Sequence, residues 1–330
     1  MVPAPDPADS DPPDGAGERS SPTFSRHVSR VTDRFDDLVP FALVPVALSL
    51  FEFESVRRAL DPSARGFSIN VEFAFPTPLF HLWSLVDPPE PSGPPDIGPG
   101  TGPPIGGPSG TTASSGLDVT IETPFETVAL PLDAVGAAAT VWIGAVVLAY
   151  AALAAAVAAG YLGGIDRRLR RDPASIAACV VAYAPRLFAY YLVVFAAILA
   201  LVPVLVVAPP LLVLALPAAV VLGYLFYAAP FLIVVDDAGV VESFRRSYGF
   251  AVEGGPYFRF ALGHVLVAAG ASIALSVAVS AGPAGFVLAL LAATPLGLVL
   301  TAATVSLVQD LVDGGRGATG SRTRPGPARD

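Results

Sequence analysis

Polar side chains that could act inside a membrane recur at helical spacing in the last third of the chain. One apolar segment carries a histidine and three serines at multiples of four residues, and the next segment carries threonines on a similar common face. Positions four apart lie on one side of an α-helix, so the two sets could meet as a polar seam between two helices. The residues of this candidate seam are His264, Ser272, Ser276, Ser280, Thr294 and Thr301.

The candidate seam has two interpretations. Small and hydroxylated residues let membrane helices approach closely and hydrogen-bond to one another, which favours helix packing. The same residues could instead line a path for a small molecule or a lipid. The middle of every predicted span lacks Asp, Glu, Arg and Lys, which argues against ion coupling through carboxylates. We favour packing.

A second charged set follows the apolar run that ends at residue 235. An acidic pair can cap the helix that comes next, whose apolar residues recur on one face while its charged residues lie opposite. Such a helix would lie at the inner membrane surface, where it could dock a cytoplasmic protein. The residues of this candidate docking helix are Asp236, Asp237, Glu242, Arg245 and Arg246.

The same stretch carries a resemblance to a known family. A proline within an apolar run is followed by an acidic pair and by two serines four residues apart, in the positions Pro230, Asp236, Asp237, Ser243 and Ser247. This order resembles uncharacterised prokaryotic multi-span proteins related to the membrane domain that accompanies some glycerophosphodiester phosphodiesterases. Hydropathy agrees more loosely over residues 140–310. The resemblance implies a multi-span membrane domain, but the metal-binding catalytic domain of those phosphodiesterases has no counterpart in this sequence, so hydrolysis is not implied.

No catalytic or metal site is expected. His27, His81 and His264 are predicted to fall inside, outside and within the membrane, so they cannot share a metal ion. Cys179 is the only cysteine, which excludes an intramolecular disulfide. We therefore predict a non-enzymatic protein with no cofactor and no metal.

Composition assigns the chain to the membrane proteins. Of its 330 residues, 53% are hydrophobic and only 14% are charged, and the mean hydropathy is +0.64. A soluble chain of this length could not bury so much apolar side chain. The net charge of −9, with 19 Arg and no Lys, is typical of an acidic, halophile-like protein and lacks the basic surface that nucleic-acid binding requires.

Six segments meet or approach the roughly 20 helical residues that cross a bilayer core of about 30 Å. The expected fold class is therefore an all-α polytopic membrane protein with six transmembrane helices, short cytoplasmic amphipathic helices and a small extracellular two-stranded β insertion. The membrane domain would cover residues 38–313. Its predicted spans are 38–54, 136–160, 187–208, 211–235, 258–280 and 284–308.

The distribution of arginine predicts the orientation. With six spans and a cytoplasmic N-terminus, 16 of the 19 Arg lie on the inner side, as the positive-inside rule requires. If residues 38–54 formed a re-entrant segment instead, 12 Arg would lie on the inner side of the membrane and 7 on the outer side. Charge therefore favours six spans in the plasma membrane with both termini in the cytoplasm.

Amphipathic segments precede the outward spans. Residues 23–37, 176–187 and 241–252 each place apolar residues on one helical face, so each is predicted to be a short interfacial helix. They could mark three tandem repeats, or be ordinary amphipathic loops. Residues 1–22 are an acidic, Pro-rich tail and residues 314–330 a second tail, and both are predicted to be disordered.

Residues 61–132 are predicted to form an extracellular insertion. Segments 67–75 and 117–125 alternate apolar and polar residues, which favours two strands that could pair. Residues 87–116 are rich in Pro and Gly and are predicted to be disordered. A two-stranded sheet is marginal in water, so its apolar face should lie on the helices, the lipid or a second copy of the protein.

The function expected from these features is that of a membrane scaffold which organises partners or lipids through its inner helices. The alternative is a small-molecule or lipid transporter, permease-like, that uses the candidate seam. The expected partners are the lipid bilayer and either a cytoplasmic protein or a second copy of the chain, but not a nucleic acid.

Overall fold

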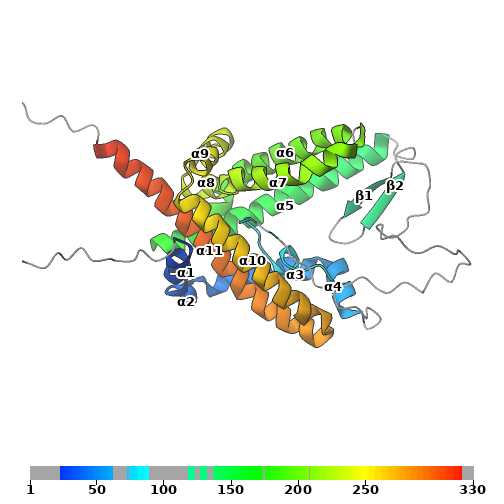
Figure 1. The fold of residues 1–330 in the computed structure, drawn as a ribbon, viewed down its shortest axis with the longest axis horizontal. Helices are drawn as coiled ribbons and strands as arrows, with labels where there is room; N and C mark the ends of the chain where they lie inside the picture. The colour runs from blue at the N-terminus through cyan, green and yellow to red at the C-terminus, as the bar shows by residue number, and fades with distance from the viewer. Residues whose placement is uncertain are drawn as a thin grey trace, which may run out of the picture.

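The computed structural model describes residues 23–61, 73, 75–88, 118–122, 127–131, 137–173, 175–207 and 209–321, which form mainly long helices (Figure 1). Within these ranges, five helical segments are long and apolar enough to cross a membrane. The protein is therefore membrane-embedded and helical. The five segments are Gly144–Arg170, Ile176–Leu201, Val213–Val235, Pro256–Ser280 and Pro283–Gly314.

The first predicted span is bent. Helix α2 (Phe35–Leu38), a 3₁₀ turn (Val39–Ala42) and α3 (Leu43–Phe51) precede α4 (Phe53–Leu60), which turns away by 74°. The helix breaks at Glu52, whose carboxylate lies 3.4 Å from the ring of His81. This geometry fits a broken span or a re-entrant loop, so the sixth span stays a prediction.

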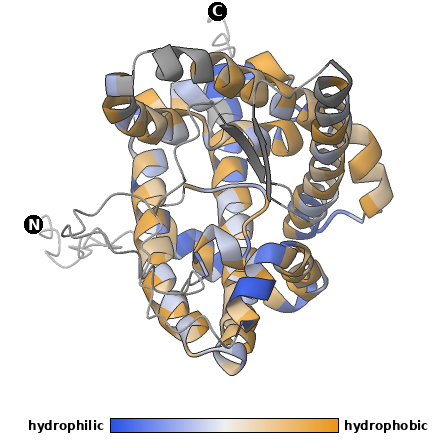
Figure 2. Cartoon of the chain, turned by 90° about the vertical axis from the view of Figure 1, so that its right-hand side faces the viewer, coloured by the Kyte–Doolittle hydropathy of each residue, from blue (hydrophilic) through white to orange (hydrophobic). Residues whose placement is uncertain are grey.

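The long helices form two arms that diverge from a common junction (Figure 1). One arm contains α5 (Ala137–Arg170), α6 (Ile176–Val207) and α7 (Leu212–Phe226), and the other contains α10 (Pro256–Ser280) and α11 (Pro283–Ser321). Hydrophobic residues recur along the helices of the chain (Figure 2). Large apolar side chains are exposed along both arms, as expected for helices that face lipid.

The contact between α5 and α6 depends on small residues. A Cβ atom at Gly163 would lie 2.7 Å from the Cβ of Cys179, and one at Gly160 would lie 3.1 Å from the side chain of Ile176. Glycine at these positions lets the two backbones approach closely. The predicted interfacial helix 176–187 and the predicted span 187–208 form one continuous helix, α6, whose first turns pack against α5.

Two other helix boundaries differ from the predicted ones. The predicted span 211–235 matches the apolar segment Val213–Val235, but a short turn divides it into α7 and α8 (Ala229–Val235), because Pro230 in the first turn of α8 has no N–H to continue the ladder. Helix α11 continues to Ser321, into the predicted tail 314–330, and an ion pair from Arg316 to Asp236 holds this extension. Residues 322–330 and 1–22 lie outside the described residues.

The core lies at the junction of the arms. Every residue of α8 is buried there, and α8 contacts α5, α6, α9 and α11. The rings of Tyr227 and Tyr257 stack with centroids 4.3 Å apart, and Phe260 and Tyr161 are also buried. Helix α9 (Val240–Glu253) covers one side of this core.

Part of the predicted insertion packs among the helices. In the segment 75–88, Phe80, Leu82 and Leu85 are almost completely buried. A Cβ atom at Gly297 of α11 would lie 2.9 Å from the carbonyl oxygen of Phe80, so the segment rests directly on that helix. The indole of Trp83 stacks on Phe286 and donates a 2.6 Å hydrogen bond to the carbonyl oxygen of Ser49.

A β-hairpin forms in the later part of the predicted insertion. Strand β1 (Asp118–Glu122) pairs antiparallel with β2 (Thr127–Pro131), with Val119 opposite Leu130. The sequence predicted that residues 67–75 would pair with the segment that contains β1, but residues 67–75 lie almost entirely outside the described residues. Residues 89–116 of the predicted disordered stretch lie outside them as well. The extracellular position of the insertion stays a prediction.

Candidate functional site

The residues of the candidate seam do not gather in one place. Ser272 and Ser276 of α10 are buried, and the Ser272 hydroxyl donates a 2.6 Å hydrogen bond to the carbonyl oxygen of Leu85. The ring of His264 contacts that of Phe80, with centroids 5.8 Å apart. This face of α10 therefore packs against the segment 75–88.

The other members of the candidate seam lie apart from that contact. Ser280 and Thr294 donate to carbonyl oxygens one turn earlier on their own helices, at 2.8 and 2.7 Å. Thr301 is buried on α11 and faces Tyr161 of α5. The hydroxyls of Ser272, Ser280 and Thr294 thus bond to backbone carbonyl oxygens within the protein, which favours the packing interpretation over a continuous path.

The acidic pair of the candidate docking helix is used inside the protein. The carboxylate of Asp236 is only 3% exposed and accepts from Arg246 of α9 and from Arg316 of α11, the latter at 2.6 Å. Asp237 accepts from Arg186 of α6, whose guanidinium also donates to the Asp237 carbonyl oxygen at 2.9 Å. These ion pairs join three helices, so Asp236, Asp237 and Arg246 contribute to holding α6, α9 and α11 together.

The outer face of α9 is amphipathic. Val241, Arg245 and Tyr248 are exposed, whereas Ser243 and Ser247 are fully buried. The Ser247 hydroxyl donates a 2.8 Å hydrogen bond to the carbonyl oxygen of Leu225. Helix α9 thus packs through its small residues and leaves apolar side chains outward, as an interfacial helix does.

Helix α1 (Thr23–Thr32) docks across α10 and α11. It ends earlier than the predicted 23–37, and the ring of Phe24 sits where a Cβ atom at Gly263 would lie, at 2.7 Å. The buried ring of His27 shares a 3.0 Å hydrogen bond with the Ser306 hydroxyl through Nδ1. On the exposed side, Arg30 pairs with Asp310 at 2.9 Å.

Docking of α1 is expected to weaken in acid. Burial lowers the pKa of His27 from 6.5 to about 4, and the neighbouring Arg26 and Arg30 lower it further while Asp310 opposes them. The imidazole of His27 binds a proton more readily when α1 is undocked than when it is docked. The docked state of α1 therefore loses stability relative to the undocked state as the pH falls from about 6.5 towards 4. Hydrogen exchange of residues 23–32 should therefore accelerate over that range. In His27→Gln the acceleration should be absent, and an equal pH response in this variant would contradict the assignment.

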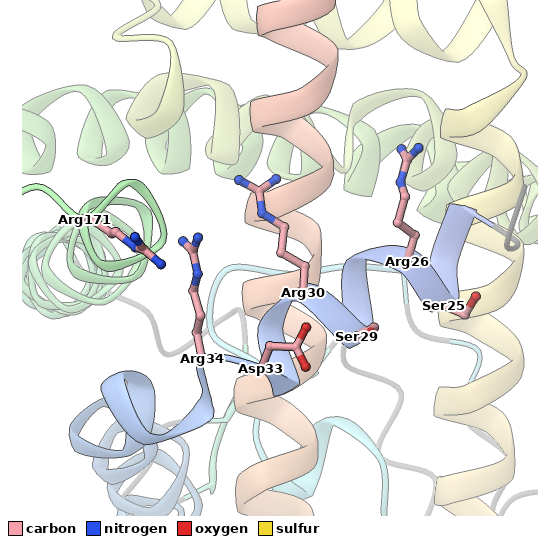
Figure 3. A pocket seen from close by; sticks show the side chains of 7 residues that line it. All are labelled: Ser25, Arg26, Ser29, Arg30, Asp33, Arg34 and Arg171. Atoms are coloured by element: carbon pink, nitrogen blue, oxygen red, sulfur yellow. The ribbon is translucent and has the colours of Figure 1, made fainter.

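Sequence reasoning missed an open basin lined with arginine, of about 650 Å³, beside α1 (Figure 3). Figure 3 shows the guanidinium group of Arg171 pointing toward that of Arg34, with those of Arg30 and Arg26 extending from the same side of α1. We call this cavity the arginine basin. Its lining residues are Ser25, Arg26, Ser29, Arg30, Asp33, Arg34 and Arg171.

The end of α5 positions two of these side chains. Arg171 has a φ of 61°, the left-handed conformation that commonly ends a helix, and the N–H of Asp172 donates to the carbonyl oxygen of Arg167 at 2.9 Å. Arg34, which follows α1, donates to the carbonyl oxygen of Leu169. The last turn of α5 is thereby tied to α1, and the guanidinium of Arg171 forms no hydrogen bond or ion pair within the described ranges.

A second cavity adjoins the basin. It encloses about 920 Å³ beside the turn between α5 and α6, and we call it the groove. Phe41, Gly164 and Ile176 supply apolar lining, while Arg167, Arg168 and Arg171 supply charge. Arg171 lines both cavities.

The chemistry available here is anion binding. Guanidinium groups bind phosphate through paired N–H donors in a planar fork. Arg26, Arg30 and Arg34 recur at every fourth residue, a signal visible in the sequence. The sequence could not show that α1 would bring this row to the end of α5. Among the described residues, no three His, Cys, Asp or Glu side chains are grouped as a metal would need.

Comparison with protein-family models, with curated proteins and with solved structures finds no match for this chain. The family resemblance carried by Pro230, Asp236, Asp237, Ser243 and Ser247 therefore stays a prediction.

Proposed function

We propose that this chain is a non-enzymatic, multi-pass protein of the plasma membrane that gathers anionic lipids at its cytoplasmic face. The arginine basin is the observation that carries the proposal. It lies beside the last turn of α5, where the apolar segment Gly144–Arg170 ends, and so at the depth of lipid headgroups. Basic pockets at the ends of membrane helices suit phosphate-bearing headgroups.

Orientation supports the same proposal. The positive-inside rule places both termini, and with them α1 and the basin, in the cytoplasm, where anionic lipids create a negative surface potential. The exposed apolar side chains of α9 would enter the same leaflet from the other side of the junction. The hydrogen bond from Ser272 to Leu85 and the contact of His264 with Phe80 favour this role over the transport alternative.

Retention of lipid tests the proposal. The protein is purified in mild detergent, and its bound lipids are identified by mass spectrometry. An Arg near an anionic surface contributes about 1 kcal/mol, so the variant Arg26→Gln/Arg171→Asn, which removes two arginines of the basin, should retain on the order of 30-fold less anionic lipid. Asparagine is chosen at position 171 because it tolerates a positive φ.

The matched control is Arg57→Gln/Arg58→Gln, which removes the same charge from α4, on the predicted outer side of the membrane. It should retain anionic lipid as the unaltered protein does. Equal loss in the two double variants would mean that overall charge, rather than the basin, recruits the lipid. A preparation without anionic lipid would overturn the proposal.

A further inference from the structure

The arginine basin and the groove form one site with two cationic parts. Arg26, Arg30 and Arg34 line only the basin, whereas Arg167 and Arg168 line only the groove. Arg171 belongs to both, because it stands in the turn after α5 where the two cavities meet. A ligand that contacts the guanidinium of Arg171 can therefore extend into the basin or into the groove.

The charge of the joined site exceeds that of a single phosphodiester. Six arginines line the two cavities, against the three carboxylates of Asp33, Asp37 and Asp172. This leaves an excess of three positive charges within a chain whose net charge is −9. Arg26 and Arg30 share one further acid, Asp310, which still leaves an excess of two. One phosphodiester would neutralise only part of this charge.

Not all of this charge is committed to internal pairs. The side chains of Arg168 and Arg171 form no hydrogen bond or ion pair within the described ranges, and Arg26 has one long contact, 3.5 Å, with Asp310. A guanidinium has five N–H donors, so Arg34 keeps free donors after it binds the carbonyl oxygen of Leu169. Donors therefore remain available on both sides of Arg171.

The surroundings of the groove favour a lipid over a soluble anion. Phe41 and Ile176 line it, and Ile176 begins the apolar segment Ile176–Leu201 of α6. Ile176 and Val181 are 55% and 78% exposed, so an apolar surface leads away from the groove along α6. An acyl chain attached to a headgroup in the groove could lie on this surface.

We propose that the joined basin and groove bind one phospholipid that carries two phosphate groups, one on each side of Arg171. This inference rests on the proposed function and adds the chemical class of the ligand. One phosphate lies among Arg26, Arg30 and Arg34, and the other beside Arg168. Because both phosphate groups belong to one lipid molecule, binding of the first phosphate raises the effective concentration of the second.

Competition between two lipids tests this inference. The purified protein is offered cardiolipin and phosphatidylglycerol with the same acyl chains at equal phosphate concentration, and the bound lipid is counted by native mass spectrometry. Cardiolipin should be preferred by about tenfold, because its second phosphate binds without a further loss of translational freedom. Arg171→Asn should reduce the preference to about twofold or less while phosphatidylglycerol still binds.

Variants specific to each cavity complete the test. Arg26→Gln changes only the basin and Arg168→Gln only the groove, and each should lower cardiolipin binding several-fold. Arg259→Gln, at an exposed position of α10, should leave the preference unchanged. Melting temperatures equal to that of the unaltered protein would show that the variants are folded.

Three results would overturn the inference. They are equal binding of the two lipids, an undiminished preference in Arg171→Asn, and binding of inorganic pyrophosphate as tight as that of cardiolipin, which would indicate a soluble ligand. If both lipids bind equally well, only this inference fails and the proposed function stands. If neither lipid binds, the proposed function fails as well.

Discussion

Replacing Arg170 with leucine is expected to destabilise the protein by about 2–3 kcal/mol, because it leaves a buried carboxylate without its cation. The Asp166 side chain is only 7% exposed and accepts a 3.1 Å hydrogen bond from Arg170 Nε. Its other partner is Gln309 of α11, which donates a neutral bond of 2.8 Å. Unfolding monitored in a denaturing detergent should show the loss.

A second substitution separates charge from packing. In Asp166→Leu/Arg170→Leu no charge is left buried, so most of the lost stability should return. Arg259→Leu, at an exposed position on α10, should change stability by less than about 0.5 kcal/mol. If the double variant is as unstable as Arg170→Leu alone, lost packing rather than the unpaired carboxylate is the cause.

Replacing Gly297 with leucine is expected to displace the segment 75–88 from α11. Even a Cβ atom at this position would lie 2.9 Å from the carbonyl oxygen of Phe80, and backbone cannot yield as a side chain can. Overpacking of this kind costs about 1–3 kcal/mol. The stacking of Trp83 on Phe286 should be lost with the segment.

Fluorescence of Trp83 reports this displacement. In a Trp142→Phe background Trp83 is the only tryptophan, and its emission should shift to longer wavelength in Gly297→Leu as the indole reaches water. The control is Gly270→Leu, because nothing lies within 4 Å of a Cβ atom at that position of α10. An unshifted emission in Gly297→Leu would mean that the segment is not held against α11.

The helical, membrane-embedded class of this protein could be predicted from the sequence because it depends on local properties. Long apolar runs must form helices in lipid, where every backbone group needs an internal partner. For the same reason the predicted segment 258–280 lies close to the bounds of α10, and the predicted segment 284–308 begins with α11 but ends before its apolar segment does, at Gly314. The sequence did not predict that α6 is one continuous helix. Its first turns are amphipathic, which is typical of an interfacial helix, and only the structure shows that they pack against α5.

The candidate sites depended on contacts that sequence spacing does not contain. Spacing placed Ser272 and Ser276 on one face of a helix, but it could not show that the segment 75–88 covers that face. Sequence spacing predicted that Asp236 and Asp237 cap the following helix. In the structure their carboxylates instead form ion pairs with arginines from three different helices, Arg246, Arg316 and Arg186.

The sequence by itself determined that this protein folds in a membrane and that its segments are helical. Both properties depend on the length of apolar runs and on the spacing of residue types along a single helix. Only the tertiary structure decided which faces meet. Arg34 and Arg171 are 137 positions apart and line one basin only because α1 docks across α10 and α11 and reaches the end of α5. Such a meeting depends on the shape and burial of surfaces distant in sequence, and no local pattern specifies it.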